Sequence, residues 1–276
     1  MAAQRTSLAL LWPVSRLLLA TAGAIAGATI AHGHHRRRRA ERLAAATLET
    51  LLNAIDANDA VTGAHVRRVA AYSLVLACAL GLDEHRQREI ERVALFHDIG
   101  KLHAALFDII HDNDKLTVEE RRAIATHPER GAEVLAPLAA FYPTLAAGVL
   151  AHHERWDGRG YPKRLRGEQI PLTSRVVALA DTFDAITAAR RYHRGENVGK
   201  ALSVIRAGRA AQFDPRLTDV FLQPSVVRDL TNAMRDARER ARRKARPNRR
   251  RSAERGAPDV SFRWRDRVVQ PSTEKS

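Results

Sequence analysis

The sequence predicts an all-α protein, on three observations. Apolar residues recur three or four positions apart through most of the chain, which is the spacing of one helix face. Helix start signals, such as Asp83 and the Thr117-Val118-Glu119-Glu120 capping box, precede several of these stretches. No segment reads as a βαβ unit or as a set of alternating strands, and no internal repeat is visible. With 276 residues, 45% of them hydrophobic, the chain can bury the core of one large domain or two small ones.

The predicted helices follow one another through most of the chain. Apolar residues lie three or four apart along them, and the first four are bounded by a residue that caps or stops a helix. In order, the expected helices are 43–55, ending near Asn58-Asp59; 66–80, stopped by Gly81; the stretch from Asp83 to Asp98; one starting at Thr117; and about 142–153, 173–190, 197–210 and 225–245.

The charge of +15 is concentrated at the two ends of the chain. Residues 1–42 carry a net charge of +6 and residues 235–276 a net charge of +9, so the middle holds 24 basic and 24 acidic residues. A neutral domain with basic tails predicts tails that contact something anionic, such as a membrane surface, nucleic acid or an acidic protein. Because only the tails are basic, nucleic acid is not the expected main partner. The single cysteine excludes a disulfide framework and a cysteine-based metal cluster.

The N-terminal segment, residues 1–35, is predicted to be an apolar membrane anchor. Between Thr6 and Ala31 only Arg16 is charged, and roughly 20 apolar residues suffice to span a bilayer. The basic linker that follows, residues 36–44, begins with four arginines, which the positive-inside rule places in the cytoplasm. We therefore expect a protein of the cytoplasmic membrane whose main domain faces the cytoplasm. The alternative is an unstructured or mitochondrial-like basic leader.

The C-terminal part is expected to be a helix over residues 223–245 and a basic, disordered tail over residues 246–276. The tail contains three consecutive arginines, Arg249 to Arg251, among scattered Ser, Gly and Pro, a composition that does not support a core. It would either attach the protein to lipid or nucleic acid, or be a solvated extension.

Two polar pairs each follow an apolar helical stretch that should be buried. They are His97-Asp98 and His152-His153. Buried polar groups need partners, and a metal ion is one good partner. His65, His127 and Asp181 complete a set of ligands that suits Fe, Mn or Zn better than a soft metal. Taken singly, each residue could equally be a hydrogen-bonded core residue.

Read together, four motifs resemble the HD-GYP family, a branch of the HD phosphohydrolases. The resemblance covers about residues 45–222 and implies a single helical HD-type domain. The motifs are Asp59 to Val69, His97-Asp98-Ile99-Gly100-Lys101, the stretch from His152-His153 to Gly160-Tyr161-Pro162, and Asp181-Thr182-Phe183-Asp184.

The resemblance implies a metal-dependent phosphodiesterase that hydrolyses cyclic di-GMP to a linear dinucleotide or GMP with a hydroxide activated by two metals. Asp98 would be the bridging carboxylate, and Lys101 would contact the scissile phosphate. Fe or Mn is expected, because imidazole is a poor ligand for Mg. The implied metal ligands are His65, His97, Asp98, His127, His152, His153 and Asp181, and the implied substrate contacts are Lys101, Gly160, Tyr161, Pro162, Asp184 and Arg190.

Several departures from the family pattern leave alternatives open. Val61 stands where members with a third metal have Glu, so two metals are expected. Changes after Lys101 and at Arg191-Tyr192-His193 affect the residues expected around the substrate. The alternatives are an HD phosphohydrolase acting on another nucleotide or phosphate ester, and a non-catalytic, metal-stabilised signalling module. In the latter, the Gly160-Tyr161-Pro162 loop would dock a signalling protein partner.

Overall fold

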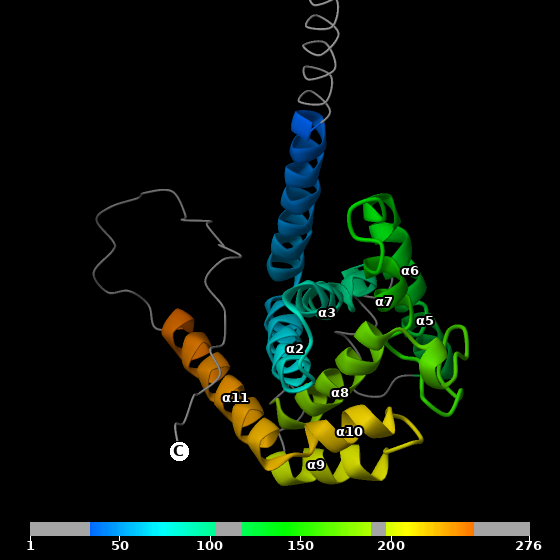
Figure 1. Cartoon of the computed structure of the whole chain (residues 1–276), viewed down its shortest axis with the longest axis vertical. Helices are drawn as coiled ribbons and strands as arrows, with labels where there is room; N and C mark the ends of the chain where they lie inside the picture. Colours follow the sequence, from blue (N-terminus) through cyan, green and yellow to red (C-terminus); the bar gives the residue numbers. More distant parts are fainter. Residues whose placement is uncertain (1–33, 103–116, 189–196, 246–276) are drawn as a thin grey trace, which may run out of the picture. The chain divides into compact units, whose positions relative to one another are not determined.

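The computed structural model describes residues 34–102, 117–188 and 197–245, which are predominantly helical (Figure 1). Within these ranges one isolated bridge, between Arg209 and Phe213, is the only strand-like pairing. The prediction of an all-α protein with one helical domain is therefore confirmed. The chain divides into two compact units, Met1–Arg235 and Asp236–Ser276, and in the second unit residues 236–245 are helical.

The described helices begin with one over residues 34–58, whose buried face carries Leu48, Leu52 and Ile55. Their bounds correspond in most cases to the stretches predicted from apolar spacing. After residue 58 they are α2 (Ala60–Ala79), α3 (Glu84–Phe96), the 3-10 helix η1 (Ile99–Leu102), α5 (Val118–Ile124), α6 (His127–Leu135), η2 (Ala136–Leu138), α7 (Leu145–Leu150), η3 (Gly167–Gln169), α8 (Leu172–Thr187), α9 (Val198–Ala207), α10 (Pro215–Phe221) and α11 (Pro224–Ala245).

The predicted capping residues begin these helices by accepting free backbone N–H groups. The Asp83 carboxylate accepts the N–H of Arg86 at 2.8 Å. Thr117 and Glu120 form the expected capping box, in which each side chain accepts the other residue's backbone N–H. Gly81 follows α2 with φ of 67°, a left-handed conformation that glycine adopts without steric cost. These local signals explain why the helix starts could be predicted from sequence.

Two short helices, α6 and α10, were not predicted. They have nine and seven residues, and each carries a proline in its first turn. Neither is long enough to show a full apolar stripe in the sequence. The helix predicted over 142–153 is also shorter than expected, because α7 ends at Leu150 and the following histidines lie in a turn.

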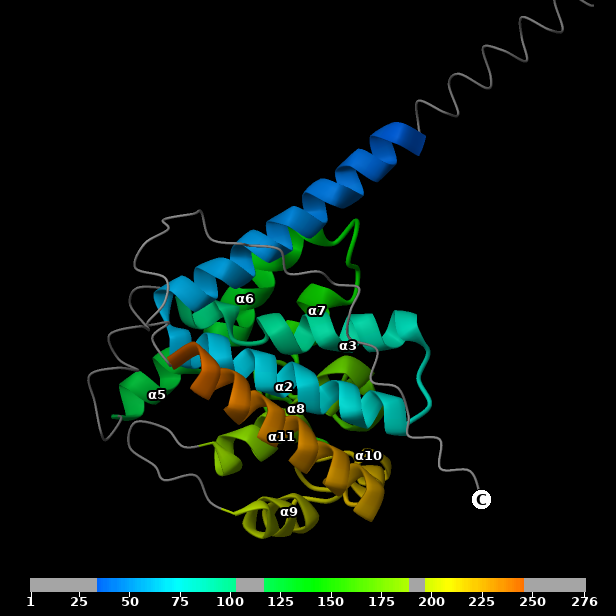
Figure 2. The same ribbon diagram turned by 90° about the vertical axis from the view of Figure 1, so that its left-hand side faces the viewer.

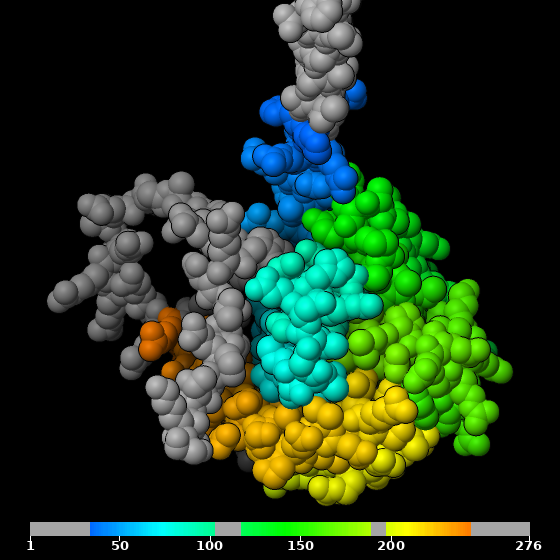
Figure 3. All heavy atoms as spheres, in the orientation of Figure 1, coloured from blue at the N-terminus to red at the C-terminus, as the bar shows by residue number. Residues whose placement is uncertain are grey.

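The core is built where α2 packs against both α3 and α8. Tyr72 of α2 contacts Phe183 of α8 edge to face, with ring centroids 5.1 Å apart, and Phe183 meets Phe221 of α10 at 5.8 Å. Figure 2 shows α2 and α3 side by side with α8 next to them. In the space-filling view, residues around the turn between α2 and α3 (cyan) cover the middle of one face (Figure 3). This packing directs one face of α2, the end of α3 and one face of α8 toward each other.

In the part of the chain that the structure describes, no helix is long and apolar enough to cross a membrane. The predicted anchor lies almost wholly in residues 1–33, and the predicted disordered tail in residues 246–276. Both are outside the described residues, as is Arg190.

Gly100 brings η1 into direct backbone contact with α6. A Cβ atom at this position would lie 2.1 Å from the carbonyl oxygen of His127 and 2.8 Å from the backbone nitrogen of Gly131. These are backbone atoms, so they cannot turn aside as a flexible side chain can. The contact keeps the residues just before η1 next to the first turn of α6.

We expect Gly100→Ala to lower the free energy of unfolding by about 2 kcal/mol or more, because the added methyl group forces two backbones apart. Urea denaturation in the presence of a chelator measures this without any contribution from metal binding. The control is Gly199→Ala on the exposed surface of α9, where the nearest atom is the Asn197 side-chain oxygen. Equal stability of the Gly100 variant and the wild type would show that the two backbones can separate at little cost.

Candidate metal centre

Seven residues predicted as metal ligands lie together where five helices meet. One is in α2, one in α8, and the others follow α3, begin α6 or follow α7. Six of them form two groups in which the potential ligand atoms lie within 4.8 Å of one another: His65, His97 and Asp98 in the first, and His127, His152 and His153 in the second. Asp181 adjoins the first group, with its Oδ1 atom 3.3 Å from Nε2 of His65 and 4.0 Å from Nε2 of His97. Their role as ligands stays a prediction.

Three of the histidine rings are held by helix-end carbonyl groups. The Nδ1 atom of His97 donates to the carbonyl of Ala94 at 2.8 Å, and His127 and His152 make the same contact three residues back, at 2.7 and 2.6 Å. Each acceptor is a carbonyl in the last turn of a helix, which has no partner within that helix. Because a carbonyl can only accept, Nδ1 carries the proton and Nε2 of the neutral ring presents a lone pair.

Asp98 lies between the two groups and presents one oxygen to each. Its Oδ2 atom is 3.6 Å from Nε2 of His65 and 3.5 Å from Nε2 of His97, whereas its Oδ1 atom is 3.3 Å from Nε2 of His127. Lys101 also binds Oδ2, at 2.8 Å. Burial alone would raise the pKa of Asp98, but Lys101 and His97 hold that pKa well below its usual range. A buried, ionised carboxylate that presents one oxygen to each of two ligand groups can bridge two cations.

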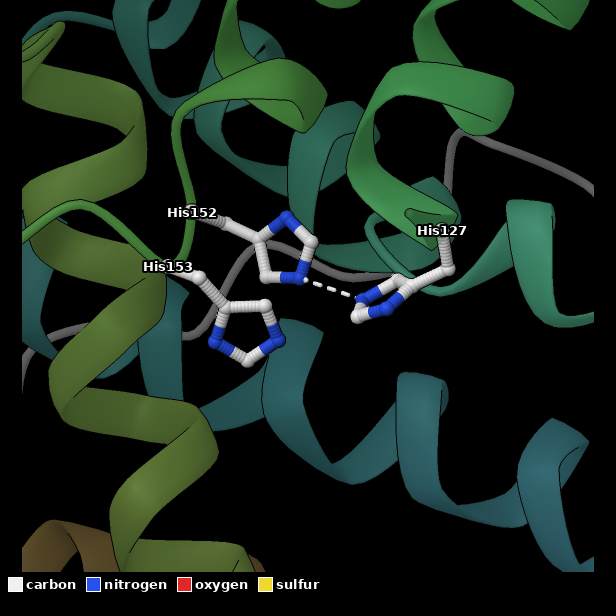
Figure 4. Close-up of side chains that lie close together, drawn as sticks. All are labelled: His127, His152 and His153. Atoms are coloured by element: carbon white, nitrogen blue, oxygen red, sulfur yellow. Dashed lines mark hydrogen bonds between the residues drawn. The ribbon is translucent and has the colours of Figure 1, made fainter. Parts of the chain in front are cut away.

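The ring nitrogens of the second group fit a cation. Nε2 of His127 and Nε2 of His152 lie 3.1 Å apart and point toward each other (Figure 4). Since both rings use Nδ1 as the donor, two lone pairs would face each other unless a proton or a metal ion lay between them. Burial and the nearby rings hold the pKa of His152 well below its usual range, and burial and His127 lower the pKa of His153 to about 4. Both rings are therefore neutral at physiological pH, as metal ligands must be.

The first group shows the same requirement. Nε2 of His97 and Oδ1 of Asp98 are buried and have no hydrogen-bond partner. Leaving such atoms unpaired is costly. A metal ion at the first group would satisfy Nε2 of His97, and an ion at the second group would satisfy Oδ1 of Asp98, which faces His127. Imidazole and carboxylate are donors that suit Fe, Mn and Zn. The residues present therefore fit divalent metal binding.

His65 differs from His97, His152 and His153, because its carboxylate neighbours raise its pKa whereas the pKa values of the other three rings are lowered. Burial lowers its pKa, but hydrogen bonds to Asp181 and Asp184 outweigh burial and raise the pKa to about 9. Its Nδ1 atom donates to Oδ2 of Asp184 at 2.7 Å. Nε2 consequently faces Asp181 and Asp98, on the side of the predicted metal.

Asp184 lies behind His65 and is fully buried. Arg68 binds both of its oxygens, at 2.7 and 2.9 Å. Because both of its oxygens accept hydrogen bonds from protein groups, Asp184 is placed to orient His65. From the sequence, it was instead expected to contact the substrate. Arg68 was not predicted to take part. Its position three residues after His65, on the same helix face, was the available signal.

The Gly160-Tyr161-Pro162 loop borders the second group. The ring of Tyr161 stacks on that of His153, with centroids 4.9 Å apart and an interplanar angle of 23°. Burial, together with Asp98 and Asp181, raises the pKa of Tyr161 to about 12, so its hydroxyl stays protonated. Lys101 is half-buried, and its ammonium binds the Oδ2 atom of Asp98, on the side of the first group. The structure thus places Lys101 and Tyr161 at the edge of the two groups.

Comparison with known families agrees with this geometry. The profile described as "HD domain" matches residues 49–217, more than half of the chain. The chain belongs to the HD domain family.

Three curated proteins illustrate its similarity to other HD domain proteins. The cyclic di-GMP phosphodiesterase response regulator RpfG of Xanthomonas campestris is 39% identical over 178 residues, covering 64% of this chain and 47% of that protein. The 3'3'-cGAMP-specific phosphodiesterase 2 of Vibrio cholerae is 37% identical over 174 residues, covering 63% and 33%. A cyclic di-GMP phosphodiesterase of Vibrio cholerae is 35% identical over 181 residues, covering 60% and 37%. This chain therefore spans half or less of the length of these relatives.

In this HD domain, we expect Asp184→Asn to weaken metal binding about tenfold to a hundredfold. The Asn side chain can accept only through one oxygen, so its NH2 group would face either His65 or Arg68, which both donate. Calorimetric titration of the metal-free protein with Mn²⁺ measures the affinity.

The matched control for this test is Asp219→Asn. Asp219 also binds an arginine through both oxygens, Arg209 at 2.7 Å each, but on the surface. Affinities that match the wild type in both variants would remove Asp184 from the support of the metal centre.

Proposed function

We propose that this HD domain protein is a metal-dependent phosphodiesterase that hydrolyses cyclic di-GMP, or a related cyclic dinucleotide, to a linear dinucleotide or GMP. The observation that carries the proposal is the position of Asp98, a buried carboxylate with one oxygen toward each of two ligand groups. Three relatives whose printed names are cyclic di-GMP or cGAMP phosphodiesterases support the choice of substrate class.

The donor set favours two divalent ions, Fe or Mn, with one at each group. When bound, such ions polarise a phosphoryl oxygen and lower the pKa of water. His65, His97 and Asp181 would hold the first ion, and His127, His152 and His153 the second, with Asp98 shared. Magnesium prefers oxygen ligands and is a poor match for five imidazoles.

The remaining residues would bind and orient the phosphodiester. The ammonium of Lys101, next to Asp98, is placed to stabilise negative charge that develops on the phosphoryl oxygens. Tyr161 keeps its hydroxyl proton and can donate a hydrogen bond at the edge of the second ligand group. Hydrolysis adds the water oxygen to phosphorus and releases the ribose oxygen as a hydroxyl. Cleavage of one phosphodiester therefore opens the ring of the cyclic dinucleotide. Arg190 and a protein partner at the Gly160-Tyr161-Pro162 loop stay predictions.

We expect the double variant His97→Ala, Asp98→Ala to lose turnover by about a thousandfold or more, because it removes ligands from the first group and the shared carboxylate. The assay is chromatographic separation of cyclic di-GMP, 3'3'-cGAMP and their linear products, with Mn²⁺ or Fe²⁺ under reducing, anaerobic conditions. His85→Ala, an exposed histidine on α3, is the matched control.

Two outcomes of this assay would contradict the proposal. Unchanged turnover in the double variant would remove Asp98 from the mechanism. A wild-type protein that binds two metals but opens no cyclic dinucleotide would indicate another phosphate ester. Higher turnover with Mg²⁺ than with Mn²⁺ or Fe²⁺ would overturn the metal assignment alone.

We also infer that residues 1–35 anchor the protein to the cytoplasmic membrane with the domain in the cytoplasm. The support is the apolar run before residue 32 and the four arginines from Arg36 to Arg39, which begin the helix over residues 34–58. Deletion of residues 1–35 should move the protein from the membrane fraction to the supernatant, as measured by immunoblotting of fractions washed with high salt. Shortened protein that stays with the membrane at low salt and is released by high salt would assign attachment to the basic C-terminal tail, and a supernatant wild type would exclude an anchor.

A further inference from the structure

Glu154 is a buried carboxylate for which neither the metal centre nor the proposed reaction has a role. It directly follows the His152-His153 pair and is 4% exposed. Its Oε1 atom accepts the backbone N–H of Lys163 at 2.6 Å, and its Oε2 atom accepts the backbone N–H of Leu165 at 3.0 Å. One side chain therefore closes the loop over residues 154–165 on itself.

The residue between these two donors adopts a conformation that needs support. Arg164 has φ of 54°, in the left-handed region where a non-glycine residue pays a steric cost of about 1 kcal/mol. The two hydrogen bonds from Glu154 reach the backbone on either side of Arg164 and hold this turn. The Arg164 side chain is exposed, so the carboxylate acts on the backbone.

Within the same loop, the backbone at Gly160 lies directly against the backbone of residues 153–155. A Cβ atom on Gly160 would lie 2.4 Å from the backbone nitrogen of Arg155 and 2.6 Å from the carbonyl oxygen of His153. The backbone N–H of Tyr161 donates to that same His153 carbonyl at 3.3 Å. The loop thus folds back on the histidine pair, and this return places the Tyr161 ring on the ring of His153.

The base of the loop is held independently of Glu154. The backbone N–H of Trp156 donates to the carbonyl of Gln212 at 3.1 Å, and that of Asp157 donates to the carbonyl of Ala211 at 2.8 Å. Gly167 donates to the carbonyl of Trp156 at 3.0 Å. Loss of Glu154 would therefore release residues 161–165 while the base of the loop stays in place.

We propose that Glu154 is a positioning residue that sets the place of Tyr161 beside the metal centre, and thereby the affinity for the cyclic dinucleotide, without serving the metals. The inference rests on the proposed function and deepens it by naming a residue that determines substrate fit. A carboxylate suits this task because it offers two acceptor oxygens to two N–H donors. Gln would place an NH2 group against one of those donors.

The test compares Glu154→Gln with the wild type in the full chain loaded with Mn²⁺. Glu168→Gln is the matched control, because Glu168 lies in η3 just beyond the loop and its side chain is 74% exposed. We expect KM for cyclic di-GMP to rise about tenfold in Glu154→Gln, with kcat within threefold of the wild type and the bound Mn²⁺ unchanged. A fall in kcat together with loss of Mn²⁺ would overturn the proposal, as would an unchanged KM.

A second measurement separates this proposal from the proposed function. Trypsin can cut after Lys163, Arg164 and Arg166, which are exposed residues of the loop. Cleavage after Arg164, followed by mass spectrometry, should be at least about tenfold faster in Glu154→Gln than in the control, since the turn opens locally. This readout does not depend on activity, so it tests whether the two hydrogen bonds from Glu154 hold the turn even if no cyclic dinucleotide is hydrolysed. An unchanged rate of cleavage after Arg164 would show that Glu154 does not hold this turn and would overturn the proposal.

If Glu154→Gln fails to fold, as judged by circular dichroism, Glu154→Asp takes its place. Asp keeps the charge and both oxygens but is one methylene shorter, so it cannot reach both N–H groups. The same rise in KM and the same faster cleavage are expected, and wild-type values for both would overturn the proposal.

Discussion

The candidate site depends on hydrogen bonds between histidine Nδ1 atoms and carbonyl groups at the ends of helices. Three helices, α3, α5 and α7, end close together, and each offers a last-turn carbonyl to a histidine that follows it. One contact satisfies the free carbonyl, selects the tautomer and sets the ring direction. Because the rings are buried, they have few other orientations available. The helix ends therefore determine where the Nε2 atoms meet, and Asp98 lies at that point.

The charges of the cluster nearly cancel before any metal binds. Asp98, Asp181 and Asp184 are ionised, because the pKa of each is lowered by neighbouring cations or hydrogen bonds that outweigh burial. Opposite them stand Arg68, Lys101 and His65, whose pKa of about 9 keeps it protonated at neutral pH. A balanced cluster limits the cost of burying ions. Bound divalent ions would displace the His65 proton and turn the site positive, which would suit an anionic phosphodiester.

The sequence was informative where local rules decide the structure. Capping at Asp83 and Thr117 and the apolar stripes predicted most helices, because these features act within one or two turns. The polar pairs His97-Asp98 and His152-His153 were noticeable because each follows an apolar stretch; the structure places the first directly after α3 and the second in the turn after α7. The short helices α6 and α10 could not be predicted in this way. They are held by packing against other segments, and each is too short for its apolar spacing to be recognised as a helix from the sequence alone.

Residue spacing could not predict which carboxylates of the site face the ligand nitrogens and which lie behind them. Asp181 and Asp184 lie three residues apart on α8, so helical geometry points both toward the same side. It does not show that one faces the ligand nitrogens of His65 while the other lies behind the ring, next to Arg68. That difference arises from the packing of α2 against α8, which brings the His65 ring between the two carboxylates and the Arg68 guanidinium against Asp184. Residue type and order thus identify members of a site, whereas the packing of the helices assigns one acid to the metal side and the other to its support.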